Sequence, residues 1–238
     1  LYHPDKLITS GKYLAHFGKD GRIYRTKQKA KMSPKVIGSV DEAISHYWSE
    51  AECQSSCYKL FTAEVIRKNS VRFREGIHNH EDGLFVFEYL HGTRGLVFID
   101  EVVWTVLKRP GSCTQSYDHG KLLSVIVADD LMLNHPSNTP TIKEFCAVYH
   151  VIFTTLVWLR AIEFGAKAEE VDFWRKHLHD YAVMVFKSDY AGMKAKVKVA
   201  GVFLPSRMLL LVNKVRKLLR QSRNNLKSEL GAEWLQPS

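Results

Sequence analysis

The order of the hydrophobic patterns limits the fold of this chain more than any other feature. Short segments rich in β-branched and aromatic residues fill the first half, and long segments with helical periodicity follow the loop NHPSNTP, residues 134–140. Strands that alternate with helices would indicate a parallel α/β sheet, whereas strands followed by helices indicate an α+β fold. The sequence therefore predicts an α+β protein, with a β-rich N-terminal half and a helical C-terminal half.

Turn residues separate the predicted strands of the first half. A hairpin is expected at residues 12–28, where Gly18-Lys19-Asp20-Gly21 connects two strand-like segments. Further strands are predicted at VRFREGI, LFVFEYL, LVFIDEVVWTVL and KLLSVIVA, which are residues 71–77, 84–90, 96–107 and 121–128. A helix is expected at residues 39–48, because Ser39 and Glu42 have the spacing of a capping box.

The second half contains three segments with helical periodicity, residues 141–164, 168–188 and 207–230. The first of them is apolar, but His150 interrupts it and Arg160 ends its apolar run early. A membrane-spanning helix needs about 20 predominantly apolar residues, so we expect a buried core helix and no membrane partner. The predicted modules are a zinc-finger-like β-rich module, a strand-rich connector and a helical module, residues 1–90, 91–138 and 139–238.

The charge balance is strongly basic. The chain has 34 Lys and Arg against 25 Asp and Glu, a net charge of +9, which favours anionic partners. Two groups of cations are the candidate nucleic-acid contacts; they are Arg22, Arg25, Lys27, Lys29 and Lys31 in the first half, and Lys214, Arg216, Lys217, Arg220 and Arg223 in the last predicted helix. Each phosphate that such residues neutralise adds affinity through counterion release, although a solvated loop and a solvent-facing helix surface would have the same composition.

Cysteine usage indicates a reducing compartment, because four cysteines in 238 residues do not make a disulfide framework. Two of them, Cys53 and Cys57, lie four residues apart and precede His78 and His80 by about twenty residues. Zinc prefers four such ligands, supplied as two close pairs. Residues i and i+2 of an extended strand point to the same side, so His78 and His80 could supply the second pair. These four residues are the candidate ligands of a Zn²⁺ cofactor.

The order of these ligands resembles the zinc fingers of the WRKY, GCM and FLYWCH group, which also occur in Mutator-like transposases. The resemblance covers about residues 10–85 and rests on the segments HNHE at 78–81, CYKLFT at 57–62 and HYW at 46–48. It implies a small antiparallel sheet around structural zinc, binding to DNA or protein, and a nuclear location. The spacing departs from the group's pattern, since Cys53 follows Trp48 by five residues and the gap between the cysteines is short.

A competing interpretation needs no metal. Residues 40–66 can be read as one amphipathic helix, with Val40, Ile44, Tyr47 and Phe61 roughly in phase. Cys53 and Cys57 would then be ordinary core residues of that helix. The two interpretations differ in one local feature, which is whether the chain breaks near residues 52–56.

Three functions follow from these patterns. The first is a non-enzymatic protein that binds DNA or RNA through the zinc-finger-like module and the basic helix, with a protein partner for the helical module. The second is an assembly protein that binds RNA without zinc, such as a nucleocapsid-like or ribonucleoprotein component. The third is a truncated transposase-derived nuclease, in which Asp100 would hold Mg²⁺.

Overall fold

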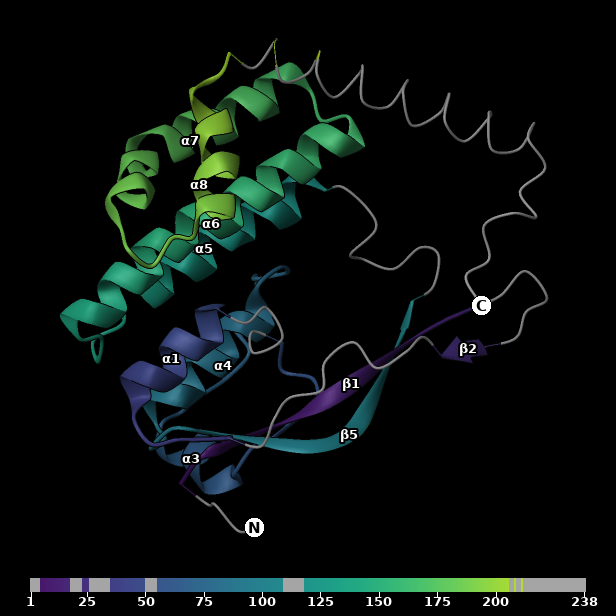
Figure 1. The fold of residues 1–238 in the computed structure, drawn as a ribbon, viewed down its shortest axis with the longest axis vertical. Coiled ribbons are helices and arrows are strands. Elements are labelled where there is room, and N and C mark those ends of the chain that lie inside the picture. Colours follow the sequence, from purple (N-terminus) through teal and green to yellow (C-terminus); the bar gives the residue numbers. More distant parts are fainter. Residues whose placement is uncertain are drawn as a thin grey trace. The chain divides into compact units, whose positions relative to one another are not determined.

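The computed structural model of the chain describes residues 5–17, 23–25, 35–49, 55–108, 118–205, 208 and 211. The chain divides into two compact units, Leu1–His150 and Val151–Ser238 (Figure 1). A small mixed sheet lies in the first unit and helices make up most of the rest, which confirms the predicted α+β class with an N-terminal sheet and a helical C-terminal half. The separate modules predicted with boundaries at residues 90 and 138 stay a prediction.

The sheet of the first unit has five strands, which are β1 (Leu7–Phe17), β2 (Ile23–Arg25), β3 (Lys35–Ile37), β4 (Lys59–Leu60) and β5 (Leu96–Lys108). The strand order is β2-β1-β5-β3, and β4 also pairs with β1. The expected hairpin of the first half is present as the antiparallel pair β1 and β2. The sheet is mixed, because its two long strands β1 and β5 are parallel while the short strands are antiparallel to them.

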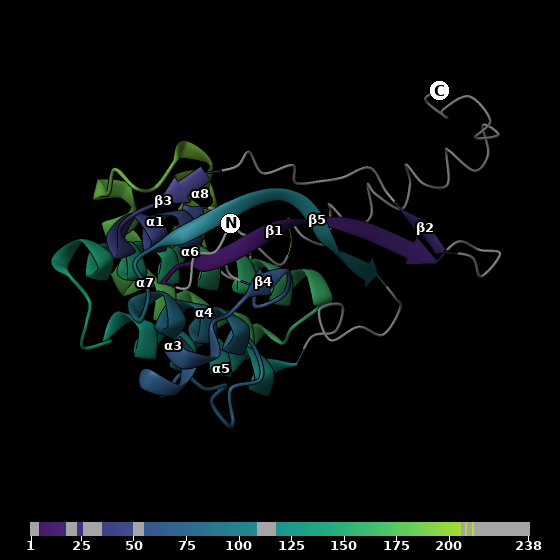
Figure 2. The same cartoon turned by 90° about the horizontal axis from the view of Figure 1, so that it is seen from below.

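The long strands run side by side along their length (Figure 2). Their register begins with Leu7 opposite Leu96, and it shifts on both sides of Gly11. Gly95 precedes β5 with a φ of +131°, and a Cβ there would lie 1.9 Å from the carbonyl oxygen of Ile37. Only glycine fits this close approach of β3 to the start of β5.

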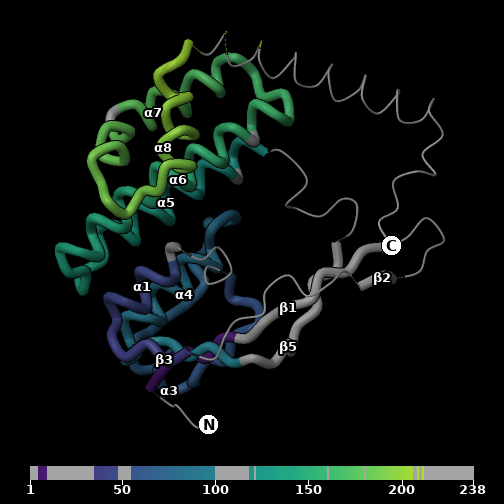
Figure 3. The backbone as a smooth tube through the Cα atoms, in the orientation of Figure 1, coloured from purple at the N-terminus to yellow at the C-terminus, as the bar shows by residue number. Residues whose placement is uncertain are grey.

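Helices α1 (Val40–Ser49), α3 (Ala63–Lys68), α4 (Glu81–His91), α5 (His119–Leu133) and the first part of α6 (Pro140–Phe164) complete the first unit. The start of α1 is capped as predicted, since Ser39 Oγ accepts a hydrogen bond of 3.2 Å from the Glu42 amide. Figure 3 shows α1 and α4 next to one another. The core joins the sheet to these helices through buried residues such as Leu7, Tyr47 and Phe87.

Two predicted strands are helices. Residues 84–90 lie in α4, where every residue from Gly83 to Leu90 is buried, and residues 121–128 lie in α5. A short run of apolar residues has no period that separates a buried strand from a buried helix. Residues 71–77 form a loop in which Val71 and Ile77 are buried, instead of the predicted strand.

The second unit contains the rest of α6, together with α7 (Ala168–Lys187), α8 (Met193–Ala200) and a short 3₁₀ helix, η2 (Gly201–Phe203). Gly165, with a φ of +86°, ends α6 as predicted. Trp158 of α6 is fully buried and donates a hydrogen bond of 2.9 Å to the carbonyl oxygen of Val171 in α7. The predicted helix at residues 168–188 is confirmed, whereas the one at residues 207–230 lies almost wholly outside the described residues.

Helix α6 is the one described helix that is long and apolar enough to cross a membrane by length and composition. Its most apolar window has a mean hydropathy of 1.6, and 59% of that window is buried inside the protein. The buried residues include Ile142 and Cys146 in the first unit and Trp158 in the second. This burial is what the prediction of a core helix requires.

Candidate functional site

The most unusual group of side chains in the first unit is a buried carboxylate between two imidazoles. Asp129 of α5 contacts the Nδ1 atom of His80 at 2.8 Å and the Nδ1 atom of His150 at 2.7 Å. All three residues are less than 10% exposed. They come from the loop before α4, from α5 and from α6, so the group ties three segments of the unit together.

The electrostatics of this group keep Asp129 ionised. Burial alone raises the pKa of a carboxyl, but the two imidazoles outweigh it and hold the pKa of Asp129 below its usual range. An ionised carboxylate can only accept hydrogen bonds, so Nδ1 of His80 and Nδ1 of His150 each donate. Hydrogen bonds to a charged group are stronger than neutral ones, so this group holds its three segments firmly together. We call His80, Asp129 and His150 the anchor.

The anchor fixes the segment that leads into α4. His80 is the residue before the helix, and it has a left-handed φ of 69°. The amides of His78 and Asn79 donate to Ser124 Oγ of α5, at 3.2 and 3.0 Å. Helix α5 therefore holds residues 78–80 at two points, Ser124 and Asp129, and fixes where α4 begins.

Gly83 is needed for the packing around His80. A Cβ at this position would lie 2.3 Å from His80 Cδ2 and 3.0 Å from the hydroxyl of Tyr47. The Tyr47 hydroxyl donates a hydrogen bond of 2.6 Å to the Gly83 carbonyl oxygen. Burial raises the pKa of Tyr47, and the negative charge of Asp82 adds to that effect.

Glu81 and Asp82 form the first turn of α4, directly after the anchored segment. Both side chains are partly exposed, and neither has a cationic partner among the residues that the structure describes. The Asp82 carboxylate accepts a hydrogen bond of 2.8 Å from the Gly83 amide, which orients it. The amides at the start of a helix stabilise negative charge. The start of α4 thus presents one oriented carboxylate, Asp82, beside a second one, Glu81, and we call this place the α4 site. A positioned carboxylate can accept a proton from a bound ligand.

A second polar region surrounds an open cavity of about 490 Å³ between α3 and the start of β5. Its charged lining consists of two acids and two bases, which are Asp5, Glu64, Lys68 and Arg94. His91 borders it and stacks on His135 at 4.2 Å. Burial, followed by the neighbouring His135, lowers the pKa of His91 to about 4. This region holds no buried charged group, so it is a weaker candidate than the α4 site.

The predicted zinc ligands do not come together among the described residues. Cys57 and His78 are exposed, whereas His80 is buried against Asp129, and Cys53 lies outside the described residues. The described part of the chain holds no group of three or more His, Cys, Asp or Glu side chains placed to hold a metal ion. The uninterrupted helix predicted over residues 40–66 is wrong, because α1 ends at Ser49 and a turn with a left-handed Tyr58 precedes β4.

The predicted nucleic-acid contacts lie almost wholly outside the described residues. Arg25 lies in β2, where the structure describes the backbone only. The other candidates lie outside the described residues; they are Arg22, Lys27, Lys29, Lys31, Lys214, Arg216, Lys217, Arg220 and Arg223. Asp100, the proposed nuclease residue, lies in β5, again with only its backbone described.

The sequence interpretation assigned no role to most residues of this site. Glu81 appeared only in the segment HNHE of the zinc-finger resemblance, and Asp129 had no role. His150 follows His80 by seventy residues, and no spacing rule connects residues so far apart. The available signal was the segment HEDGLF, in which two acids and a glycine precede an apolar run, as at a helix start.

Comparison with known proteins gives a likeness of fold. No protein-family model matches the chain, and no curated protein matches it in sequence. A crystal structure of S. aureus TarS residues 1–349 in complex with UDP-GlcNAc has a TM-score of 0.53 and 14% identity, and covers 92% of this chain and 61% of the TarS chain. The corresponding structure in complex with UDP has a TM-score of 0.53 and 13% identity, and covers 92% and 60%.

The chain spans about three fifths of the length of these TarS chains. At this level of identity the likeness establishes the fold, and what TarS binds is a property of TarS. It corrects the predicted function, because the fold is shared with a protein that binds UDP-GlcNAc and the described residues contain no metal-binding group. The zinc-finger nucleic-acid-binding protein, the RNA assembly protein and the transposase-derived nuclease are therefore all wrong, as is nucleic acid as the partner. Bound zinc by itself stays a prediction, since Cys53 is not described.

Proposed function

We propose that this chain is part of a protein that binds a nucleotide-linked sugar and transfers the sugar to an acceptor hydroxyl. The observation that carries the proposal is the pair of partly exposed carboxylates, Glu81 and Asp82, at the anchored start of buried α4. The fold shared with TarS, which was crystallised with UDP-GlcNAc, supports the choice of ligand.

The proposed reaction requires a base. The acceptor oxygen forms a bond to the anomeric carbon of the sugar, and the bond from that carbon to the nucleotide phosphate breaks. The nucleoside diphosphate leaves with the bonding electrons, and the hydroxyl proton passes to a carboxylate. A base in this role must hold a fixed position close to the acceptor, because small displacements lower the rate strongly.

Asp82 is the better candidate for that base. The Gly83 amide orients its carboxylate, while the side chain stays partly exposed and can reach a ligand. His80 and Asp129 do not touch the ligand in this proposal. Together with Ser124 they position the start of α4, and hence Asp82.

The test combines ligand binding with turnover. UDP-GlcNAc is titrated into the chain by calorimetry, and UDP release is measured with a panel of sugar and polyol acceptors. We expect Asp82→Asn to bind UDP-GlcNAc with nearly unchanged affinity and to release UDP about 10²–10⁴ times more slowly, the usual contribution of a positioned base. The control is Asp130→Asn, an exposed acid of α5 that hydrogen-bonds Asn134.

Two results would refute the proposal. One is the absence of binding for UDP-GlcNAc and for other UDP-sugars to a folded chain. The other is an unchanged rate of UDP release in both Asp82→Asn and Glu81→Gln, since the carboxylate pair would then have no part in the reaction.

A further inference from the structure

The second unit exposes apolar side chains beside lysines on its short helix α8. Met193 and Val197 are one turn apart and are 75% and 67% exposed. Lys194 and Lys198 are also one turn apart and exposed, on the adjoining stripe of the helix. The opposite face carries Val199, which is fully buried. Helix α8 thus packs through one face and presents to solvent a pair of large apolar side chains flanked by two cations.

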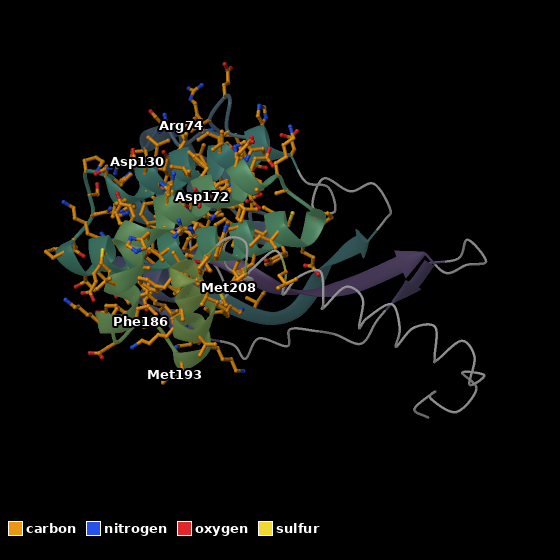
Figure 4. The ribbon with its side chains drawn as sticks, turned by 90° about the horizontal axis from the view of Figure 1, so that it is seen from above. Arg74, Asp130, Asp172, Phe186, Met193 and Met208 are labelled. Atoms are coloured by element: carbon orange, nitrogen blue, oxygen red, sulfur yellow. The ribbon has the colours of Figure 1, made fainter. Side chains whose placement is uncertain are left out.

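The end of α7 adds to this exposed region. Phe186 is 40% exposed, and Lys187 next to it is exposed. The ring of Phe186 lies 5.9 Å from the ring of Phe203 in η2, which connects the end of α7 to the segment after α8. Figure 4 labels Phe186 and Met193 and shows them in the α7–α8 part of the unit. We call Phe186, Lys187, Met193, Lys194, Val197 and Lys198 the α7–α8 surface.

The charge of this surface is positive. Residues 186–198 contain four lysines and one aspartate, Asp189, which leaves a net charge of +3. None of the four lysines is in ion-pair contact with a carboxylate of the described residues. A partner must therefore cover apolar side chains and supply negative charge at the same place.

We propose that the α7–α8 surface binds the surface of an anionic lipid bilayer. Exposed apolar side chains bounded by lysines are the composition of segments that lie in the membrane interface, where the apolar groups enter the acyl boundary and the lysines contact the headgroups. The sequence predicted no membrane partner because the apolar segment at residues 145–164 is not a spanning helix, but binding at the interface needs no such helix.

A second copy of the chain fits this surface less well. Two copies related by a twofold axis would bring the same patch against itself. The lysines of one copy would then lie close to the lysines of the other, with like-charge repulsion in a contact that excludes water. A lipid surface offers apolar chains and negative headgroups together, and so it satisfies both parts of the surface.

The test is flotation of the chain with vesicles. Phosphatidylcholine vesicles are compared with vesicles that also contain phosphatidylglycerol, at low and high salt. We expect binding to the anionic vesicles only, and weaker binding at high salt. The double variant Lys194→Gln/Lys198→Gln should bind about 25-fold more weakly, at about fivefold for each lysine near an anionic surface. Met193→Ser/Val197→Ser should lose about tenfold or more, because the apolar contribution is removed.

Matched controls carry the same changes elsewhere. Lys143→Gln and Val127→Ser alter an exposed lysine and an exposed valine of the first unit, and should bind vesicles like the unchanged chain. Circular dichroism spectra and melting curves confirm that each variant is folded. Equal binding to neutral and anionic vesicles, no binding to either, or equal binding of the α7–α8 variants and the controls would overturn the proposal. So would a chain that associates with itself in solution and loses that association in Met193→Ser/Val197→Ser.

Discussion

Replacing Asp129 by asparagine tests the anchor of the α4 site directly. The asparagine side chain has nearly the same shape, but it is neutral and only one of its two polar ends accepts hydrogen bonds. One of the two Nδ1–H donors, on His80 or His150, therefore loses its partner inside the protein. Because all three side chains are buried, water cannot take the place of the lost partner.

The expected cost follows from the bonds that change. A hydrogen bond to a charged group contributes about 1.5–3 kcal/mol, and the bond that survives becomes a neutral one worth about 1 kcal/mol. We therefore expect Asp129→Asn to lower the free energy of unfolding by about 3 kcal/mol. For a chain of this length, that corresponds to a melting temperature lower by about 6–12 °C.

The effect should depend on pH with a definite sign. The pKa of Asp129 is lowered in the folded protein, so its stabilisation is present above the unfolded-state value of about 3.9 and is lost as the pH falls through the folded value. The difference between the unchanged chain and Asp129→Asn should accordingly be full at neutral pH and should shrink below about pH 4.

Urea unfolding followed by circular dichroism measures these free energies, with Asp130→Asn as the control on the same helix. Asp130 is exposed, and its replacement should change the free energy of unfolding by about 0.5 kcal/mol or less. If Asp129→Asn differed from the unchanged chain by no more than this control does, the buried group would not be an anchor, and its proposed role in positioning α4 would be lost.

Three further changes test other parts of the structure. Gly83→Ala should lower the free energy of unfolding by about 1 kcal/mol, because a Cβ 2.3 Å from the His80 ring costs about 1–3 kcal/mol and the helix propensity of alanine offsets about 1 kcal/mol. The pKa of His91 is about 4 in the folded protein, so between about pH 6.5 and pH 4 the unfolded residue binds a proton and the folded one does not. The free energy of unfolding therefore falls as the pH falls through this range, and His91→Gln should make that fall smaller. Trp158→Phe should cost about 2 kcal/mol, through the lost bond to the Val171 carbonyl and the lost volume.

Each of these changes has an outcome that contradicts it. A Gly83→Ala chain as stable as the original would mean that the His80 ring can move aside. An unchanged slope of stability against pH in His91→Gln would mean that His91 is not held neutral by burial. For Trp158→Phe the control is Phe173→Leu on the exposed face of α7, and equal losses in the two would show that the buried bond contributes nothing.

The fold class followed from the sequence because it depends on patterns that are local. Helix α1 was predicted from Ser39, Glu42 and the apolar spacing after them, and each of these acts within one or two turns. Helices α4 and α5 were mistaken for strands, because they are apolar on nearly every side. An apolar segment is buried by the elements that pack around it. The sequence of the segment does not show whether it is a buried strand or a buried helix.

The sequence by itself determined the α+β class, the strands β1 and β5, the helices α1 and α7 and the end of α6 at Gly165. These depend on capping, turn residues and periodicity, which act between near neighbours along the chain. Only the tertiary structure decided that His80 lies against a buried carboxylate. Its partner Asp129 is 49 residues away, and its other neighbour in the group, His150, is a further 21 residues along. These two contacts depend on the packing of α5 and α6 against the start of α4, which no local pattern around His80 specifies.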